Sequence, residues 1–123
     1  MKLSQSIEDY IETIYVFERE KGYAKVNDIA SNLNVKLPSV TETIRKLAAK
    51  NLATYERYGP IKLTQRGKLI AKNIYAKHKL LAKFFILIGV DKKTAFHDAC
   101  LAEHVLSKKT ISKLRFFVKD KEK

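Results

Sequence analysis

Apolar residues recur at helical spacing along most of this 123-residue chain, and only one short stretch departs from that pattern. The chain has only 4 glycines and 2 prolines, so few residues interrupt helices. The apolar stripes predict six helices: residues 6–20 with Ser6 as N-cap, residues 25–33, a helix opened by Pro38, a long helix capped by Thr64, residues 92–106 and residues 108–119.

The departure lies between the third and fourth predicted helices. Residues 53–57 and 61–63 are strand-like and flank Tyr58-Gly59-Pro60, which is typical of a β-hairpin. The second and third helices are short and joined by Asn34-Val35, as in a helix-turn-helix, and the hairpin would be its wing. The predicted fold is therefore mainly α: a winged helix-turn-helix in residues 1–64, followed by an all-helical domain in residues 65–123.

The net charge is +12, and it is unevenly distributed. Residues 1–35 have a net charge of −2, whereas residues 36–68 contain eight basic and two acidic residues and have a net charge of +6. The isoelectric point near 9.8 makes a polyanion the expected partner. A single cysteine excludes an internal disulfide framework. The apolar run 80–90 is too short to span a bilayer and no signal peptide opens the chain, so we expect a cytoplasmic protein without membrane contact.

The helix opened by Pro38 is the expected recognition helix for double-stranded DNA, because the major groove admits one α-helix. Ser39 can donate or accept at a base edge, and Glu42 can accept from cytosine N4. Basic side chains on this helix and on the hairpin can neutralise phosphates. The alternative is a winged helix that makes only protein contacts. The predicted DNA-binding residues are Lys36, Pro38, Ser39, Thr41, Glu42, Arg45, Lys46 and Arg57.

A possible metal site begins with Cys100, Glu103 and His104, whose i, i+3, i+4 spacing places a thiol, a carboxylate and an imidazole on one helical face. In isolation this trio is a weak signal, and a core cysteine beside an ordinary Glu-His pair is the simpler interpretation. His78 lies on an apolar stripe, where a core histidine is the simpler interpretation. Asp9 and Glu12 are one turn apart and, alone, are typical of solvated carboxylates.

Several of these motifs together resemble the diphtheria-toxin-repressor and manganese-transport-regulator family of metal-dependent transcriptional repressors. The resemblance covers nearly the whole chain. It rests on Ile7-Glu8-Asp9-Tyr10-Ile11-Glu12-Thr13-Ile14-Tyr15, Lys21-Gly22-Tyr23-Ala24, Pro38-Ser39-Val40-Thr41, Lys77-His78, Ile88-Gly89-Val90-Asp91 and Cys100-x-x-Glu103-His104-Val105-Leu106-Ser107.

The resemblance implies a repressor of metal-homeostasis genes that binds its operator as a homodimer, with a divalent transition metal as corepressor. It implies that the second domain carries dimerisation, as in the short form that lacks an SH3-like domain. The metal ligands that it implies are Asp9, Glu12, His78, Cys100, Glu103 and His104.

The implied ligand set is a hybrid of the two branches of the family. Cys100 stands where manganese-type members usually have glutamate, and Asp9 stands where iron-type members usually have methionine. Because thiolate is the softer ligand, we favour Fe²⁺ over Mn²⁺, with Zn²⁺, Co²⁺ or Ni²⁺ as further options. Ala82 replaces a glutamate of the iron-type ancillary site, and His97 either supplies an ancillary ligand or faces solvent.

Three alternatives remain at this point: a metal-independent winged-helix regulator, a metalloenzyme, and a structural interaction module. The enzyme is disfavoured because no HExxH motif, Ser-His-Asp arrangement or glycine-rich phosphate loop occurs, and no small-molecule substrate is expected.

Overall fold

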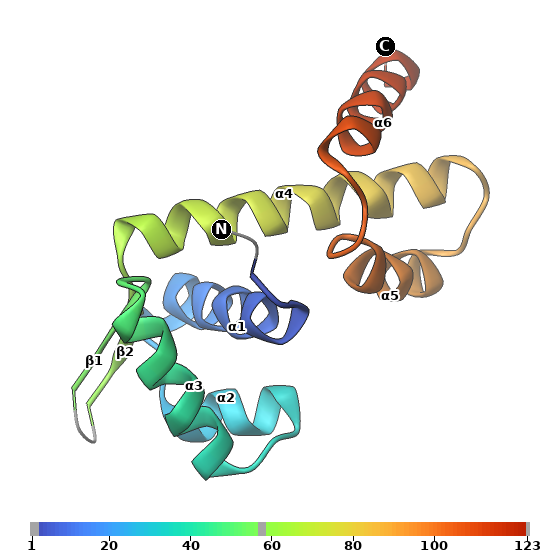
Figure 1. Ribbon diagram of the computed structural model, residues 1–123. Coiled ribbons are helices and arrows are strands. Elements are labelled where there is room, and N and C mark those ends of the chain that lie inside the picture. The colour runs from blue at the N-terminus through green and yellow to red at the C-terminus, as the bar shows by residue number, and fades with distance from the viewer. Residues whose placement is uncertain (1–2, 57–58, 123) are drawn as a thin grey trace. The chain divides into compact units, whose positions relative to one another are not determined.

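The computed structural model describes residues 3–56 and 59–122 and contains six helices and one two-stranded sheet in that part of the chain (Figure 1). This confirms the predicted mainly α fold with a hairpin after the third helix. The elements are α1 (Gln5–Lys21), α2 (Val26–Leu33), α3 (Leu37–Ala49), β1 (Ala53–Tyr55), β2 (Ile61–Leu63), α4 (Gln65–Leu87), α5 (Lys92–Ala102) and α6 (Lys108–Lys121).

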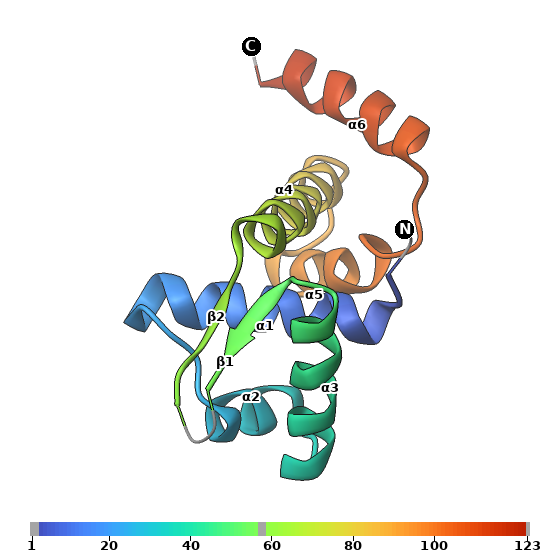
Figure 2. The same ribbon diagram turned by 60° about the vertical axis from the view of Figure 1, so that its left-hand side comes forward.

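The chain divides into two compact units, one ending at Lys72 and one beginning at Asn73, so α4 runs from the first into the second. In the first unit, α1 packs against α2, α3 and β2, and α3 packs against β1 (Figures 1 and 2). This is the arrangement of a winged helix-turn-helix.

Helix α1 begins earlier than predicted. Its N-cap is Ser4, whose extended backbone lets the side chain accept a hydrogen bond from the Ile7 N–H at 3.2 Å, whereas Ser6 lies inside the helix. The helix ends at Lys21, because the following Gly22 adopts a left-handed backbone with φ of +89°. Both ends of this 17-residue helix are therefore capped.

The core of the first unit is formed by the apolar stripes that the sequence predicted. Seven of its side chains are completely or almost completely withdrawn from solvent and come from all three helices and the second strand. They are Ile11, Ile14, Ile29, Val40, Ile44, Leu47 and Ile61.

The wing is held on both edges of its second strand. β1 and β2 are antiparallel, with Ala53 opposite Leu63 and Tyr55 opposite Ile61. On the other edge of β2, Ile61 exchanges two backbone hydrogen bonds with Ala24, at 2.8 and 2.9 Å. Ala24 follows α1, so the wing is tied to the segment that joins α1 and α2.

The second unit has a separate core between α4, α5 and α6, formed by Leu80, Leu81, Ala82, Ala99, Ile111 and Val118. Helix α5 ends at Ala102 rather than near residue 106, because the chain turns at Glu103. No helix in the described part of the chain combines the length and hydropathy that crossing a bilayer requires.

Candidate metal centre and nucleic-acid interface

His78 is the centre of a group of potential metal ligands in the second unit. Its ring lies on α4, and its Nδ1 atom is 3.6 Å from the Cys100 Sγ and 3.3 Å from the Glu103 Oε2. The Phe96 ring of α5 stacks on the imidazole with 5.9 Å between ring centroids and 11° between planes. This stacking restricts the plane of the imidazole ring.

Glu103 and His104 come from the turn that follows α5. Glu103 keeps right-handed helical dihedrals, and its N–H donates to the Ala99 carbonyl oxygen at 3.0 Å. The helical spacing from Cys100 is therefore preserved as far as Glu103, although the helix has ended. The His104 Nε2 atom lies 3.4 Å from the Glu103 Oε1, which extends the chain of contacts to four side chains.

The burial of Glu103 is the most informative electrostatic feature of this group. Its side chain is 1% exposed, and among the described residues its Oε2 atom finds no hydrogen-bond partner of acceptable geometry, although the His78 nitrogen is close. A buried carboxylate is costly unless positive charge or hydrogen bonds compensate it. A divalent cation bound beside this oxygen would supply such compensation.

The separations between neighbouring donors fit a shared ion. Two ligands bonded to one ion at about 2.1 Å (nitrogen) and about 2.3 Å (sulfur) lie roughly 3.1 to 3.6 Å apart at octahedral and tetrahedral angles. The distances of 3.3 and 3.6 Å around His78 fall in or near this range. A thiol, imidazoles and a carboxylate are also the ligand types of first-row divalent metals.

The contacts join these donors in pairs: Cys100 with His78, His78 with Glu103, and Glu103 with His104. Across residues 3–56 and 59–122, no three His, Cys, Asp or Glu side chains are already arranged to hold a metal ion. Ligand binding would require these side chains to rotate toward a shared centre. The residues fit a divalent ion in the chemistry of their side chains.

The other two predicted ligands, Asp9 and Glu12, are half-buried on α1 in the first unit. Glu12 lines a cavity of about 120 Å³ together with Thr13 and Asn32, whose side chains are 3.4 Å apart. The structure thus brings four of the six predicted ligands into neighbouring contact, and the complete set of six stays a prediction.

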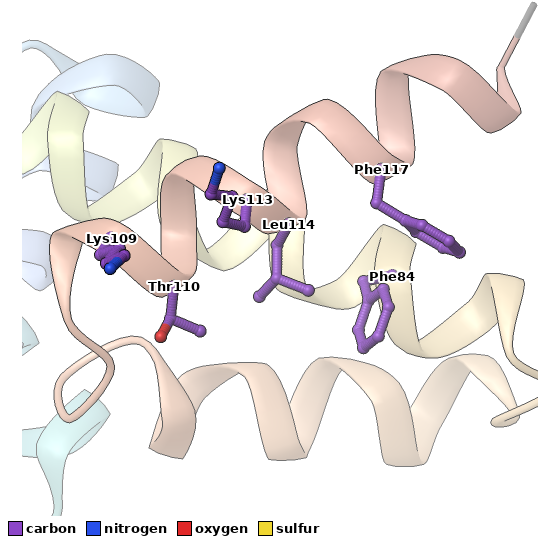
Figure 3. A pocket seen from close by; sticks show the side chains of 6 residues that line it. All are labelled: Phe84, Lys109, Thr110, Lys113, Leu114 and Phe117. Atoms are coloured by element: carbon purple, nitrogen blue, oxygen red, sulfur yellow. The ribbon is translucent and has the colours of Figure 1, made fainter.

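Two further features of the second unit lie outside this ligand group. The His97 side chain is 74% exposed and faces Asp98 at 3.5 Å. A groove of about 430 Å³ runs between α4 and α6, with aromatic and leucine side chains on one side and lysines on the other (Figure 3). Its lining residues are Phe84, Lys109, Thr110, Lys113, Leu114 and Phe117, which include no metal-ligating acid, histidine or cysteine.

Helix α3 has the form expected of a recognition helix. Val40, Ile44 and Leu47 are fully buried, so the opposite face is free to meet a partner. On that face, Glu42 and Lys46 form a loose i, i+4 ion pair at 3.9 Å. The predicted contacts Lys36, Pro38, Ser39, Glu42, Arg45 and Lys46 are exposed, Thr41 is half-buried, and Arg57 lies outside the described residues.

Sequence reasoning missed Glu18. Its side chain, 13% exposed, accepts a hydrogen bond from the Leu63 N–H at 3.1 Å and pairs with Lys68 at 3.3 Å. No local motif marks this residue, since both partners lie more than 40 positions away in sequence. Only the packing of α1 against β2 reveals it.

Two protein-family models match the chain. Residues 2–61 match the family model of the iron dependent repressor, N-terminal DNA binding domain, and residues 64–123 match that of the iron dependent repressor, metal binding and dimerisation domain. Together the two models cover nearly the whole chain.

Individual relatives lead to the same family. The chain is 43% identical over 109 residues to the HTH-type transcriptional regulators MntR of Bacillus subtilis and Geobacillus thermodenitrificans, covering 89% of this chain and 77% of each relative.

Solved structures agree. They include IdeR of T. acidophilum (TM-score 0.77, 29% identity, 94% of this chain and 55% of that one) and the hypothetical protein SSo2273 of Sulfolobus solfataricus (TM-score 0.74, 26% identity, 94% and 89%). The two matching domains disfavour the metal-independent reading, and the curated relatives are regulators rather than enzymes. The chain belongs to the iron-dependent repressor family, and is a DNA-binding, homodimeric transcriptional repressor that uses a divalent metal.

Proposed function

We propose that this repressor senses Fe²⁺ or Mn²⁺ and binds a double-stranded operator of metal-homeostasis genes when the metal is present. Residues 1–64 would form the DNA-binding domain, and residues 65–123 the dimerisation and metal-binding domain. Because its proposed partner is chromosomal DNA, we place its action in the cytoplasm. The observation that carries the proposal is the buried Glu103 carboxylate in contact with His78 and His104, with Cys100 beside His78.

The proposed ligands combine these four residues with Asp9 and Glu12. When bound, a divalent ion would supply the positive charge that compensates the carboxylates. In this scheme Glu103 and His104 contribute from the turn after α5, and His78 is oriented by Phe96. Asp9 and Glu12 would make the position of α1 dependent on the metal.

On the DNA side, we propose that the exposed face of α3 enters the major groove. Ser39 and Glu42 would meet base edges, whereas Arg45 and Lys46 would contact phosphates. Arg57 of the wing belongs to the same proposed set. Coupling between the two sites need be only about 1–3 kcal/mol to change DNA affinity roughly 5- to 150-fold.

We further propose that Cys100 shifts metal preference toward Fe²⁺. The names of relatives point both ways, since the family model is called iron dependent and a structural neighbour, 25% identical, is described as the manganese regulator SloR. Thiolate is a softer ligand than carboxylate and favours metals later than manganese in the first row.

The test is a titration of DNA binding by fluorescence anisotropy under anaerobic conditions. The probe is a duplex that the wild-type protein selects from a random library in the presence of Fe²⁺ and Mn²⁺. We expect tighter binding with metal than with chelator. His104→Ala should remove this gain, and the matched control His97→Ala should retain it.

Metal preference is tested in the same assay with Cys100→Glu. We expect this variant to respond better to Mn²⁺, relative to Fe²⁺, than the wild type does. Equal wild-type affinity with metal and with chelator would contradict the proposed switch, and an unchanged Fe²⁺ to Mn²⁺ ratio in Cys100→Glu would contradict the role of the thiol.

A further inference from the structure

Glu18 joins three elements of the DNA-binding unit through one carboxylate. It lies in the last turn of α1, and its Oε2 atom accepts a hydrogen bond from the Leu63 N–H of β2 at 3.1 Å. Its Oε1 atom lies 3.3 Å from the Lys68 Nζ in the first turns of α4. Both interactions lie inside the first unit, and the Glu18 side chain is only 13% exposed.

The Leu63 N–H needs this partner because of the register of the wing. Residues two apart in a strand direct their N–H groups to the same edge, so Leu63 faces the edge on which Ile61 pairs with Ala24. Ala24 provides a backbone partner for Ile61 only. Beside Leu63, the Glu18 carboxylate accepts the hydrogen bond that a third strand would otherwise accept. Without it, the Leu63 N–H would be left unpaired, which would lower the stability of the protein.

Helix α1 is a continuous, doubly capped element that also carries Asp9 and Glu12. A displacement of its N-terminal half is therefore passed along the helix to its last turn. We infer that Glu18 is a positioning residue that makes the wing and the start of α4 follow α1, so that metal binding at Asp9 and Glu12 sets the position of the wing. This inference rests on the proposed function and assigns the transmitting contact.

Glu20 provides a matched control. It is an exposed acid on the same last turn of α1, and its replacement changes the net charge by the same amount. Glu18→Ala removes both interactions. Glu18→Gln keeps an acceptor for the Leu63 N–H but removes the charge that faces Lys68, and it guards against a variant that fails to fold.

The first measurement is made without metal. Amide hydrogen exchange at Leu63, followed by NMR, should be at least tenfold faster in Glu18→Ala than in the wild type. In Glu20→Ala it should be unchanged, and in Glu18→Gln it should stay closer to the wild type. Equal exchange at Leu63 in Glu18→Ala and Glu20→Ala would overturn the contact itself.

The second measurement separates positioning from general stability. Metal affinity is measured by isothermal titration, and the metal-induced gain in DNA affinity is measured by anisotropy with the selected duplex. We expect the metal affinity of Glu18→Ala to stay within about twofold of that of the wild type. Coupling of this kind raises DNA affinity by roughly 5- to 150-fold when metal binds, and Glu18→Ala should lose most of that increase. Glu20→Ala should keep the full gain.

The outcomes distinguish this inference from the proposed function. If the wild type gains no DNA affinity with metal, both fail. If the wild type shows the gain and Glu18→Ala shows it undiminished, the proposed function stands and Glu18 has no positioning role. Parallel loss of metal affinity and of the gain in Glu18→Ala would also overturn the inference, since it would indicate a damaged helix rather than a broken link.

Discussion

Gly67 shows how a single residue fixes the junction of the wing and α4. A Cβ atom at this position would lie 2.1 Å from the Leu52 carbonyl oxygen and 3.2 Å from a methyl group of Leu63. The Gly67 N–H also donates to the Thr64 hydroxyl, which caps the helix as predicted. The glycine is thus required by close approach of two backbones and not by an unusual φ.

We expect Gly67→Ala to destabilise the protein by about 1–3 kcal/mol, because a backbone shift outweighs the roughly 1 kcal/mol that alanine gains in a helix. Thermal unfolding measures the difference. Gln65→Ala, exposed in the same turn, is the control and should differ little from the wild type. If Gly67→Ala unfolded at the same temperature as Gln65→Ala, the result would contradict the close approach of Gly67 to Leu52.

Asp91 gives the protein a predictable response to acid. It is the N-cap of α5, and the hydrogen bond that its carboxylate accepts from the Thr94 N–H at 3.0 Å lowers the pKa of Asp91 below its ordinary value. A lowered folded-state pKa means that stabilisation is present above the ordinary pKa and is lost as the pH falls through the folded-state pKa.

We therefore expect the unfolding free energy of the wild type to decrease more than that of Asp91→Asn as the pH falls from about 5 to below about 3.9. Asparagine still caps the helix but has no charge to lose, so other carboxylates cancel in the comparison. Thermal melts of both proteins across this range measure the effect. Parallel curves would show that the carboxylate charge at this cap has no influence.

At the scale of elements, α3 makes a prediction about DNA binding. Arg45 lies on its exposed face, away from the core stripe of Val40, Ile44 and Leu47. If Arg45 contacts a phosphate, Arg45→Ala should reduce the slope of log K against log salt by about 0.9. Lys93→Ala on α5 removes the same charge from the second unit and should leave the slope unchanged. An equal reduction in both variants would indicate an effect of net charge alone.

The periodicity of apolar residues predicted helix boundaries well where a proline or a capping side chain marks one end of the helix. Pro38 and Thr64 marked the starts of α3 and α4 to within one residue, because each acts through its own ring or hydroxyl group. The end of α5 was missed because Glu103 keeps helical dihedrals, so the apolar and polar pattern continues past the last helical hydrogen bonds.

The candidate site shows the same difference between features that depend on local sequence and features that depend on tertiary packing. Cys100 and Glu103 are three residues apart, so helical spacing alone predicted that they share a face. The approach of His78 to both depends on how α4 packs on α5, and the link from Glu18 to Leu63 depends on how α1 meets β2. Such contacts follow from tertiary packing, which a local pattern does not encode.

At the scale of the whole molecule, the cost of keeping a carboxylate buried is tied to the regulatory role. Glu103 is 1% exposed, with one oxygen lacking a hydrogen bond among the described residues. A neutral side chain of the same shape avoids the desolvation cost that a buried carboxylate carries. We therefore expect the buried Glu103 carboxylate, which serves as a metal ligand in the proposed function, to lower the free energy of unfolding of the metal-free protein.

The variant Glu103→Gln tests whether the buried carboxylate destabilises the metal-free protein. We expect its metal-free form to melt at or above the temperature of the wild type, because glutamine removes the charge and keeps the shape. The wild type should gain about 2.7 kcal/mol from an ion at 100 times its Kd, and the variant should lose this gain at the same concentration. Calorimetric melts with Fe²⁺, Mn²⁺ or chelator measure both quantities, with His97→Ala as a variant that retains the gain. A metal-free Glu103→Gln protein that is strongly destabilised would show that Glu103 serves the fold through its two histidines, and an undiminished metal gain would remove it from the ligand set.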